Sequence, residues 1–329
     1  MGRFKVALVA LDGQTVPDWV PLELGRSGID LVIHECQTRE ELGAGDADVV
    51  WVFGGSRIIT AEGLRVIPRC GAIIRTGSGT DNVPVEEATG MGIVVANTPE
   101  AHSDAVSDHA IGLLFSIIRR IPVQDRAVRA GTWNREIAWP RWHVRGQTLG
   151  LVGFGHVARL LARKLAGFEM RVLAYDPYVG ESAMKGEGVE GAGLDRVLTE
   201  SDFLSLHCPL TRQTHHIIGS REMRMMKASA VLVNTSRGAL VDESALVQAL
   251  TEGWIAAAGL DVLEQEPGAP TNPLFRLDNV VITPHIAGYS DEHLDAGWRL
   301  SAETAIALAQ GRWPRSYVNH NVRPRWDLA

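Results

Sequence analysis

The stretch Leu149-Gly-Leu-Val-Gly-Phe-Gly-His-Val-Ala158 decides the fold. A short apolar run that is typical of a buried strand leads into glycines and then into a helical pattern. Gly153 allows a tight turn, Gly155 lets the backbone approach a pyrophosphate, and Ala158 is small enough for close packing of a helix on a strand. The N-terminus of that helix offers unpaired N–H groups and a partial positive charge to phosphates. The pattern predicts a dinucleotide-binding turn.

The next strand, Val172–Asp176, supports this interpretation because it ends in an acid about 20 residues after Gly155. A carboxylate at this point accepts hydrogen bonds from the adenosine ribose and repels a 2′-phosphate. Pro177 and Tyr178 supply no neighbouring arginine. The pattern therefore predicts NAD rather than NADP. A glycine turn beside a surface aspartate is the plain structural alternative.

Strand-like and helix-like segments alternate along the whole chain, which favours parallel sheets built from β-α-β units. The strands expected in the first hundred residues are Lys5–Leu11, Ile29–His34, Val49–Phe53, Ala72–Thr76 and Ile93–Ala96. A second series suits one doubly wound domain, and it comprises Thr148–Val152, Arg171–Tyr175, Phe203–His207, Ala230–Asn234, Ala256–Leu263 and Asn279–Thr283. We expect a long helix with Ser103 as its N-cap and an interruption at Pro122, and a last helix over Glu292–Ala309.

Composition excludes several classes of protein. The 329 residues are 45% hydrophobic and 22% charged, which is typical of a globular protein of about two domains. The net charge of −7 has the wrong sign for a nucleic-acid binder. No stretch approaches the ~18 apolar residues that a membrane span needs. The first residues lack the apolar region and the small-residue cleavage site of a signal peptide, so we expect none. Cys36, Cys70 and Cys208 have neither paired nor metal-like spacing, so we expect a reduced, cytoplasmic protein without a metal site.

Three polar residues stand where successive strands of the second series end. Arg237 follows Val231–Ser236, Glu266 follows the strand ending near Leu263, and His285 follows Val280–Pro284. An arginine fork binds a carboxylate bidentately, and a histidine can give a proton to a carbonyl oxygen. A carboxylate beside that histidine would raise its pKa and orient it. Each residue taken alone is typical of a loop, but their joint placement at one sheet edge predicts a catalytic site.

Six motifs stand in order along the chain: Gly150–Gly155, Tyr175–Pro177, His207–Thr211, Val233–Gly238, Gly259–Pro267 and Thr283–Ile286. Two further landmarks are Asn97–Pro99 and Arg129–Trp133. Together they resemble the D-isomer-specific 2-hydroxyacid dehydrogenases over nearly the whole chain. Two departures from the family pattern are small. Ala158 replaces the third glycine, and Asp108 stands where the family more often has Glu.

The resemblance implies a role for each site residue. Arg237 would bind the substrate carboxylate, His285 would be the general acid and base, and Glu266, rather than Glu264, would pair with His285. The residues that the family places around NAD are Gly153, Phe154, Gly155, His156, Val157, Asp176, His207, Cys208, Pro209, Thr214, Thr235, Ser236, Asp261 and Ala287. The residues implied to contact the substrate are Arg75, Gly77, Ser78, Gly79, Arg237 and His285. Backbone N–H groups of the loop Arg75–Gly79 would form an anion-binding nest there.

The resemblance also implies two doubly wound α/β domains. A Rossmann NAD-binding domain, residues 99–289, would be inserted in a flavodoxin-like substrate-binding domain made of residues 1–98 and 290–329. Members of the family usually form homodimers through the NAD-binding domain and the helix after Ser103. The aromatic stretch Trp133–Trp142 would pack at that interface or on the surface. Alternatively, Trp139, Arg141 or Trp142 would reach an active site, that of the same chain or of its partner.

The substrate stays open at this point. We expect a glyoxylate or hydroxypyruvate reductase, because Phe53-Gly-Gly55 puts no cation at the end of the third strand. A D-3-phosphoglycerate dehydrogenase is the first alternative, with Arg57, Arg75 and Arg135 available for a phosphate. An NAD(H)-sensing corepressor like the C-terminal-binding proteins is an alternative from another class. An NAD-dependent phosphite or formate enzyme ranks last.

Overall fold

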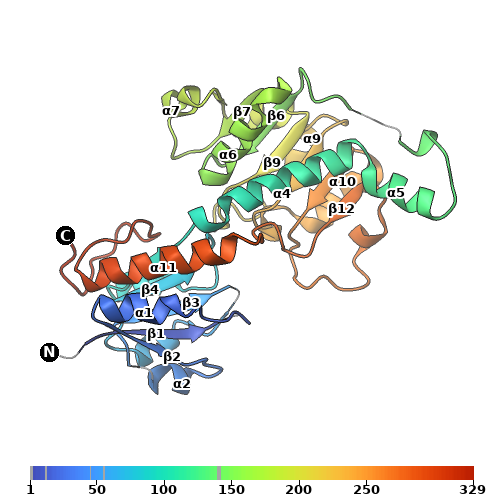
Figure 1. Ribbon diagram of the computed structural model, residues 1–329. Coiled ribbons are helices and arrows are strands. Elements are labelled where there is room, and N and C mark those ends of the chain that lie inside the picture. Colours follow the sequence, from blue (N-terminus) through green and yellow to red (C-terminus); the bar gives the residue numbers. More distant parts are fainter. Residues whose placement is uncertain (1–2, 12, 45, 55, 139–141) are drawn as a thin grey trace. The chain divides into compact units, whose positions relative to one another are not determined.

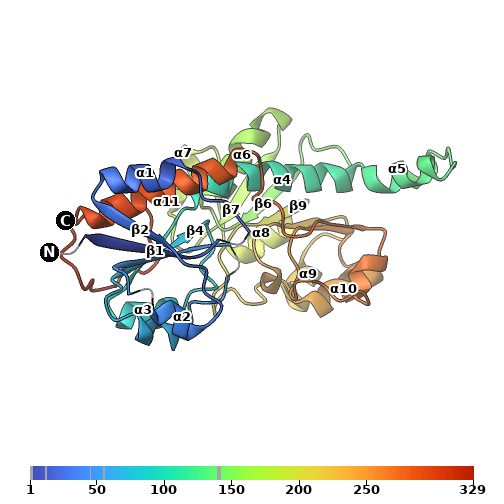
Figure 2. The same cartoon turned by 60° about the horizontal axis from the view of Figure 1, so that its bottom comes forward.

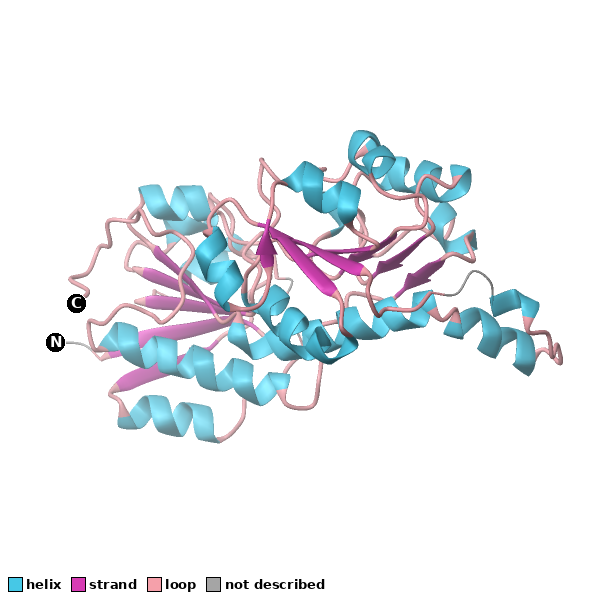
Figure 3. Ribbon diagram, turned by 90° about the horizontal axis from the view of Figure 1, so that it is seen from above, coloured by secondary structure: helices cyan, strands magenta, loops and turns pink. Residues whose placement is uncertain are grey.

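The structure is a computed structural model that describes residues 3–11, 13–44, 46–54, 56–138 and 142–329 (Figure 1). The chain divides into two compact units, and each is described by itself. Unit 1 comprises Met1–His102 with Ser290–Ala329, and unit 2 comprises Ser103–Tyr289. Each unit is a parallel sheet with helices along its faces (Figure 3). None of the described helices combines the length and the apolar character that crossing a bilayer needs.

Unit 1 has the strand order β2-β1-β3-β4-β5, which is the flavodoxin-like order. The strands are β1 (Phe4–Ala10), β2 (Ile29–Ile33), β3 (Val49–Phe53), β4 (Ala72–Thr76) and β5 (Val94–Asn97). Helices on both faces make β3 a continuous run of buried residues, as expected for a central parallel strand. In Figure 2 the helices α1 (Trp19–Arg26) and α11 (His293–Ala309) lie on one face, and α2 (Arg39–Ala44) and α3 (Val85–Gly90) on the other.

A buried polar chain connects the sheet of unit 1 to its last helix. The indole of Trp51 donates a hydrogen bond to Thr76 Oγ1 at 2.7 Å, and Thr76 Oγ1 lies 2.8 Å from Ser301 Oγ. Gly297 allows α11 to approach closely, because a Cβ there would lie 3.0 Å from Thr76 Cγ2. These contacts satisfy buried polar groups that would otherwise be costly. They bring a segment from the end of the chain into the core of the first sheet.

Unit 2 has the strand order β12-β11-β10-β9-β6-β7-β8, in which the order reverses between β6 and β9 as in a Rossmann sheet. Its strands are β6 (Thr148–Val152), β7 (Arg171–Tyr175), β8 (Glu190–Gly191), β9 (Phe203–Leu206), β10 (Val231–Asn234), β11 (Ala257–Leu260) and β12 (Val280–Ile282). Helices α4 (Glu100–Ile118) and α6 (His156–Leu165) lie on one face in Figure 2. The other face carries α8 (Leu194–Glu200), α9 (Ser220–Met225) and α10 (Glu243–Glu252).

Two further helices of unit 2 are α7 (Glu181–Gly186) and α5 (Ile121–Arg129). Helix α5 extends away from the sheet in Figure 1 and has no buried residue. The fold therefore leaves Ile121 and Val128 of α5 exposed to solvent in the isolated chain.

The expected strands are present, with ends that differ by a few residues. Three expectations were incomplete or wrong. Strand β8 was missed because its two residues carry no apolar run. Ser103 is not an N-cap, since α4 already begins at Glu100 and Ser103 is buried within it. Pro122 does not interrupt α4, which ends before the left-handed Arg120; the proline stands in the first turn of α5, where its missing N–H is tolerated.

Candidate active site

The glycine turn after β6 has the backbone shape that its sequence predicts. Gly153 has φ +90°, and a Cβ there would lie 2.6 Å from the backbone nitrogen of Cys208 at the end of β9. Only glycine therefore fits between these strands. Gly155 directly precedes α6, and a Cβ there would meet nothing within 4 Å. The space beside Gly155 at the start of α6 is therefore open, and a helix N-terminus of this kind offers N–H groups to a phosphate.

Asp176 stands at the end of β7 and faces the glycine turn. Its Oδ2 accepts the N–H of Phe154 and its Oδ1 accepts the N–H of Tyr178, both at 2.8 Å. These bonds fix the orientation of the carboxylate and leave lone pairs on both oxygens for ribose hydroxyls. His156, in the first turn of α6, is exposed, and Val157 is half-buried. The structure thus places the predicted cofactor residues of β6, α6 and β7 in one neighbourhood.

The ends of β9 and β10 are tied together next to this turn. Ser236 Oγ donates to the carbonyl of Cys208 at 2.7 Å, and Thr214 Oγ1 donates to the carbonyl of Pro209 at 2.6 Å. Burial lowers the pKa of His207 to about 4, so this imidazole is neutral at physiological pH, with Nε2 2.9 Å from Ser205 Oγ. These bonds shape the wall that the resemblance assigns to the adenosine and ribose.

Two buried groups in this region have distinct chemistry. Burial, with a smaller contribution from the charge of Asp176, raises the pKa of the Cys208 thiol to about 11, so it stays protonated. The hydroxyl oxygen of Thr235 is buried and has no hydrogen-bond partner among the described residues. A buried hydroxyl without a partner is costly unless a ligand supplies one. Thr235 therefore fits a polar group of a bound nicotinamide cofactor.

Asp261, at the end of β11, organises the turn that follows β12. Its carboxylate is buried and accepts the hydroxyl of Thr283 at 2.6 Å, the N–H of Ile286 at 2.9 Å and the N–H of Ala287 at 2.8 Å. The turn holds His285 in the left-handed region at φ +53°. That conformation costs about 1–2 kcal/mol for a residue with a Cβ. The bonds to Asp261 offset this cost and fix where the imidazole points.

His285 and Glu266 form a close pair. His285 Nδ1 lies 2.6 Å from Glu266 Oε2, while Glu266 Oε1 accepts the N–H of Leu263 at 3.0 Å. Burial alone would raise the pKa of Glu266, but these two hydrogen bonds and the charges of His285 and Arg237 hold it below its ordinary value. An ionised Glu266 needs a donor, so Nδ1 carries the proton and Nε2 is left to exchange one. Glu264 does not contact His285; it contacts His216.

Arg237 follows β10 and belongs to the same edge of the sheet. Its Nη1 donates to the carbonyl of Ser236 at 2.7 Å, and its charge acts on Glu266. Because β10, β11 and β12 are neighbours in the sheet, their carboxyl ends bring Arg237, Glu266 and His285 together. The result is a cation, an imidazole and a carboxylate at one place, which can bind an acid and move a proton.

The expected substrate loop lies in unit 1, and two of its groups are already engaged. The N–H of Gly77 donates to Thr98 Oγ1 at 2.7 Å, so it is not available to an anion. Arg75 donates to the carbonyls of Thr76 and Gly54 at 2.8 and 3.1 Å. No described residue accepts a hydrogen bond from the backbone N–H groups that follow, in Ser78 and Gly79. Their role in substrate binding stays a prediction.

Sequence reasoning missed His109, on α4. Its Nε2 lies 2.9 Å from Thr283 Oγ1 and 3.5 Å from Asp261 Oδ1. His109 therefore contacts the two residues that hold the turn carrying His285. No local pattern signals this contact, because it joins residues far apart in the chain. Of the aromatic stretch, Trp139 and Arg141 lie outside the described residues, and Trp142 packs against the core of unit 2.

Comparisons with known proteins show which family the chain belongs to. The family model described as "D-isomer specific 2-hydroxyacid dehydrogenase, NAD binding domain" matches residues 111–287. A glyoxylate reductase from Korarchaeum cryptofilum is 45% identical over 269 residues, 80% of each chain. The structure of a glyoxylate reductase from Paecilomyes thermophila has a TM-score of 0.87 at 29% identity, covering 97% of this chain and 99% of that one. An NADPH-dependent glyoxylate/hydroxypyruvate reductase from Sinorhizobium meliloti, solved with NADP and malonate, has a TM-score of 0.82 at 29% identity, covering 98% and 99%. The chain therefore belongs to the D-isomer specific 2-hydroxyacid dehydrogenase family.

Proposed function

We propose that the protein is an NAD-dependent reductase of small 2-oxo acids, with glyoxylate or hydroxypyruvate as its substrate. The observation that carries the proposal is the 2.6 Å pair of His285 and Glu266 with Arg237 on the neighbouring strand end. A cation for the acid group and a proton donor for the carbonyl are the two groups that such a reduction needs from the protein. The names of the relatives support the same substrate class.

In the proposed reaction, bound NADH supplies the hydride that reduces C2 of the 2-oxo acid. Arg237 binds the substrate carboxylate and orients the carbonyl. His285 donates the proton on Nε2 to the carbonyl oxygen as that oxygen becomes a hydroxyl. Glu266 holds Nδ1 and stabilises the positive charge of the doubly protonated imidazole before the transfer. In the oxidative direction His285 takes the proton back.

The contacts of Arg75 favour a small acid over a phosphorylated one. Two of its terminal N–H groups are used on backbone carbonyls within unit 1, so it serves the fold of that unit. A 3-phosphoglycerate enzyme would need strong cationic ligands for the phosphate. Arg57 is exposed on a loop and makes no described ion pair. We therefore propose that hydroxypyruvate is reduced in preference to its phosphate ester.

The substrate proposal is tested by the rate of NADH oxidation on a panel of 2-oxo acids. The panel contains glyoxylate, hydroxypyruvate, pyruvate, phenylpyruvate and phosphohydroxypyruvate at matched concentrations. We expect the highest kcat/KM for glyoxylate or hydroxypyruvate. A higher kcat/KM for phosphohydroxypyruvate would instead favour the phosphoglycerate alternative. Absence of turnover on every member, with NADH still bound, would contradict the proposed reaction.

The proton-transfer role predicts how two substitutions separate catalysis from binding. His285→Ala should lower kcat on the best substrate by about 10²–10⁴-fold, the usual range for a general acid. Glu266→Gln keeps the shape of the side chain but removes its charge, so a smaller loss of kcat is expected. Titration of NADH fluorescence should give nearly unchanged cofactor affinity for both variants. A His285→Ala enzyme that retains most of its kcat would refute the role of the imidazole.

Asp176 predicts the preference between the two nicotinamide cofactors. Its carboxylate repels the 2′-phosphate of NADPH and accepts hydrogen bonds from the ribose hydroxyls of NADH. Asp176→Ala should therefore raise KM for NADH and lower KM for NADPH. Asp195→Ala, an exposed carboxylate on α8, is the matched control for a change in net charge. If the ratio of the two kcat/KM values is the same in Asp176→Ala as in the parent enzyme, Asp176 does not select the cofactor.

We also propose that the protein is a homodimer joined through α5 and the adjoining part of α4. Helix α5 has no buried residue, and its Ile121 and Val128 are 53% and 47% exposed. Apolar side chains grouped on a projecting helix are typical of a covered surface.

Light scattering should give twice the mass of one chain, and Ile121→Glu with Val128→Glu should give a monomer. Leu22→Glu, at an apolar position that is 62% exposed on α1, should leave the dimer intact. A monomeric parent protein, or a dimer that survives the double substitution, would exclude α5 as the interface.

A further inference from the structure

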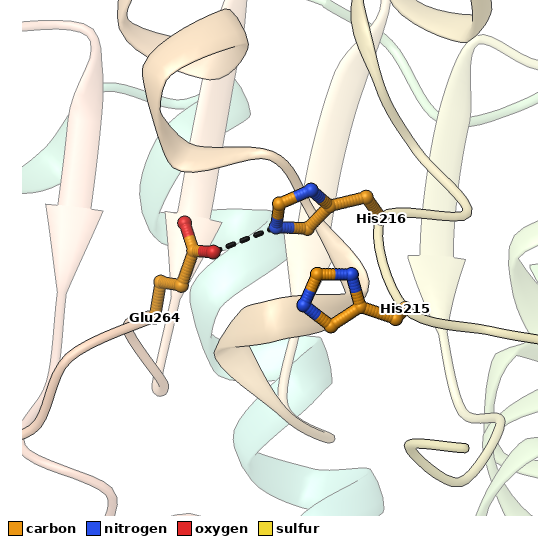
Figure 4. A group of neighbouring side chains, drawn as sticks. All are labelled: His215, His216 and Glu264. Carbon is orange, nitrogen blue, oxygen red and sulfur yellow. Dashed lines mark hydrogen bonds and ion pairs between the residues drawn. The ribbon is translucent and has the colours of Figure 1, made fainter. Parts of the chain in front are cut away.

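Two histidines and a glutamate meet at a place that the proposed reaction does not use (Figure 4). His215 and His216 lie on the segment after β9, and Glu264 lies on the segment after β11. His216 Nε2 is 2.6 Å from Glu264 Oε1, and the two imidazole rings are 3.9 Å apart between centroids. One ligand atom from each of the three side chains lies within 4.8 Å of the others.

The backbone holds the ligand-bearing segments in place. His216 has φ +52°, and its N–H donates to the carbonyl of Ala239 at 2.9 Å. Glu264 and Glu243 exchange hydrogen bonds: the N–H of Glu264 donates to Glu243 Oε2 at 3.0 Å, and the N–H of Glu243 donates to Glu264 Oε2 at 3.3 Å. Metal-binding carboxylates are commonly oriented by such outer bonds. The group therefore has first ligands and groups that orient them.

We propose that His215, His216 and Glu264 bind a divalent transition-metal cation, with Zn²⁺ as the best fit. Two imidazoles and one carboxylate are donors that Zn²⁺ accepts, with water in the fourth position. Tetrahedral zinc sets its ligand atoms about 3.3 Å apart. The Nε2 and Oε1 atoms of the His216–Glu264 pair must separate slightly, and a rotation of the exposed His215 side chain closes the third distance.

A purely structural contact explains only part of this arrangement. The bond between His216 and Glu264 could serve to connect the two segments and nothing else. That explanation gives no role to His215, which is exposed and whose ring lies against that of His216 at an angle of 31°. A metal site gives His215 a role, as the third ligand.

The cluster is mechanically connected to the candidate active site. A Cβ on Gly238 would lie 1.9 Å from the carbonyl carbon of Leu263 and 2.4 Å from the nitrogen of Glu264, so the two backbones touch. Gly238 directly follows Arg237, and Glu264 is separated from Glu266 by a single residue. A cation that moves Glu264 away from His216, to the spacing that a tetrahedral site needs, therefore displaces the segment that orients Glu266. We expect occupancy to inhibit the reductase. This part of the inference rests on the proposed function, whereas metal binding itself does not.

Binding is measured by calorimetry with Zn²⁺ on tag-free full-length protein treated with a chelator and dialysed. A stoichiometry of one cation per chain is expected. His215→Ala and Glu264→Gln should each weaken the affinity at least tenfold, while His143→Ala, an exposed histidine of the same unit, should not change it. Co²⁺ should give visible absorption bands of a tetrahedral site that both site variants lose. Circular dichroism checks that the variants are folded. Parent-like affinity in both site variants, or no binding by the parent, overturns the site.

Inhibition is measured by Zn²⁺ titration of NADH oxidation on the best substrate. In His215→Ala the concentration for half-inhibition should rise at least tenfold, while turnover without metal stays within about twofold of the parent. A chelator should restore full activity to the parent. If His215→Ala loses binding in calorimetry but is inhibited like the parent, the cation acts elsewhere and the coupling to Glu266 is wrong. If the parent reduces no 2-oxo acid, the proposed function fails while calorimetry still decides the metal site.

Discussion

The candidate active site depends on the buried carboxylate of Asp261. A carboxylate without water is costly unless donors surround it. Here the hydroxyl of Thr283 and the N–H groups of Ile286 and Ala287 supply three charge-assisted hydrogen bonds. The same bonds close the turn after β12 and hold His285 in a left-handed conformation. The position of the imidazole is therefore set by an anion that is itself held inside the sheet edge.

The parallel sheet explains why residues distant in sequence act as neighbours. Strands β10, β11 and β12 are adjacent and end at the same edge, so the residue that follows each strand joins the others there. Spatial order equals chain order in this half of the sheet. Arg237, Glu266 and His285 could consequently be predicted as a group from the sequence, since each stands a few residues after an apolar run. The same reasoning finds Gly153 and Asp176 at the ends of β6 and β7.

Other features could not be predicted because their cause is not local. The contact of His109 with Thr283 joins helix α4 to the end of β12, and nothing in the spacing of either segment indicates it. The turn N–H of Gly77 looked available in the sequence, but Thr98, across the loop, accepts its hydrogen bond. In the sequence, Glu264 was the second candidate for the partner of His285, after Glu266. The structure instead places Glu264 against His216. Apolar periodicity predicts elements well, whereas side-chain partners depend on how the loops close.

Because Gly238 has no side chain, the Arg237 turn lies directly on the Leu263–Glu264 peptide. Any group that moves one segment must move the other, and this holds in both directions. Coupling free energies between two binding sites are reciprocal. If a cation bound by His215, His216 and Glu264 lowers the affinity for substrate, bound substrate must lower the affinity for the cation by the same factor. The small-residue contact that lets catalytic side chains converge on one sheet edge therefore also makes them responsive to what binds on the neighbouring loop.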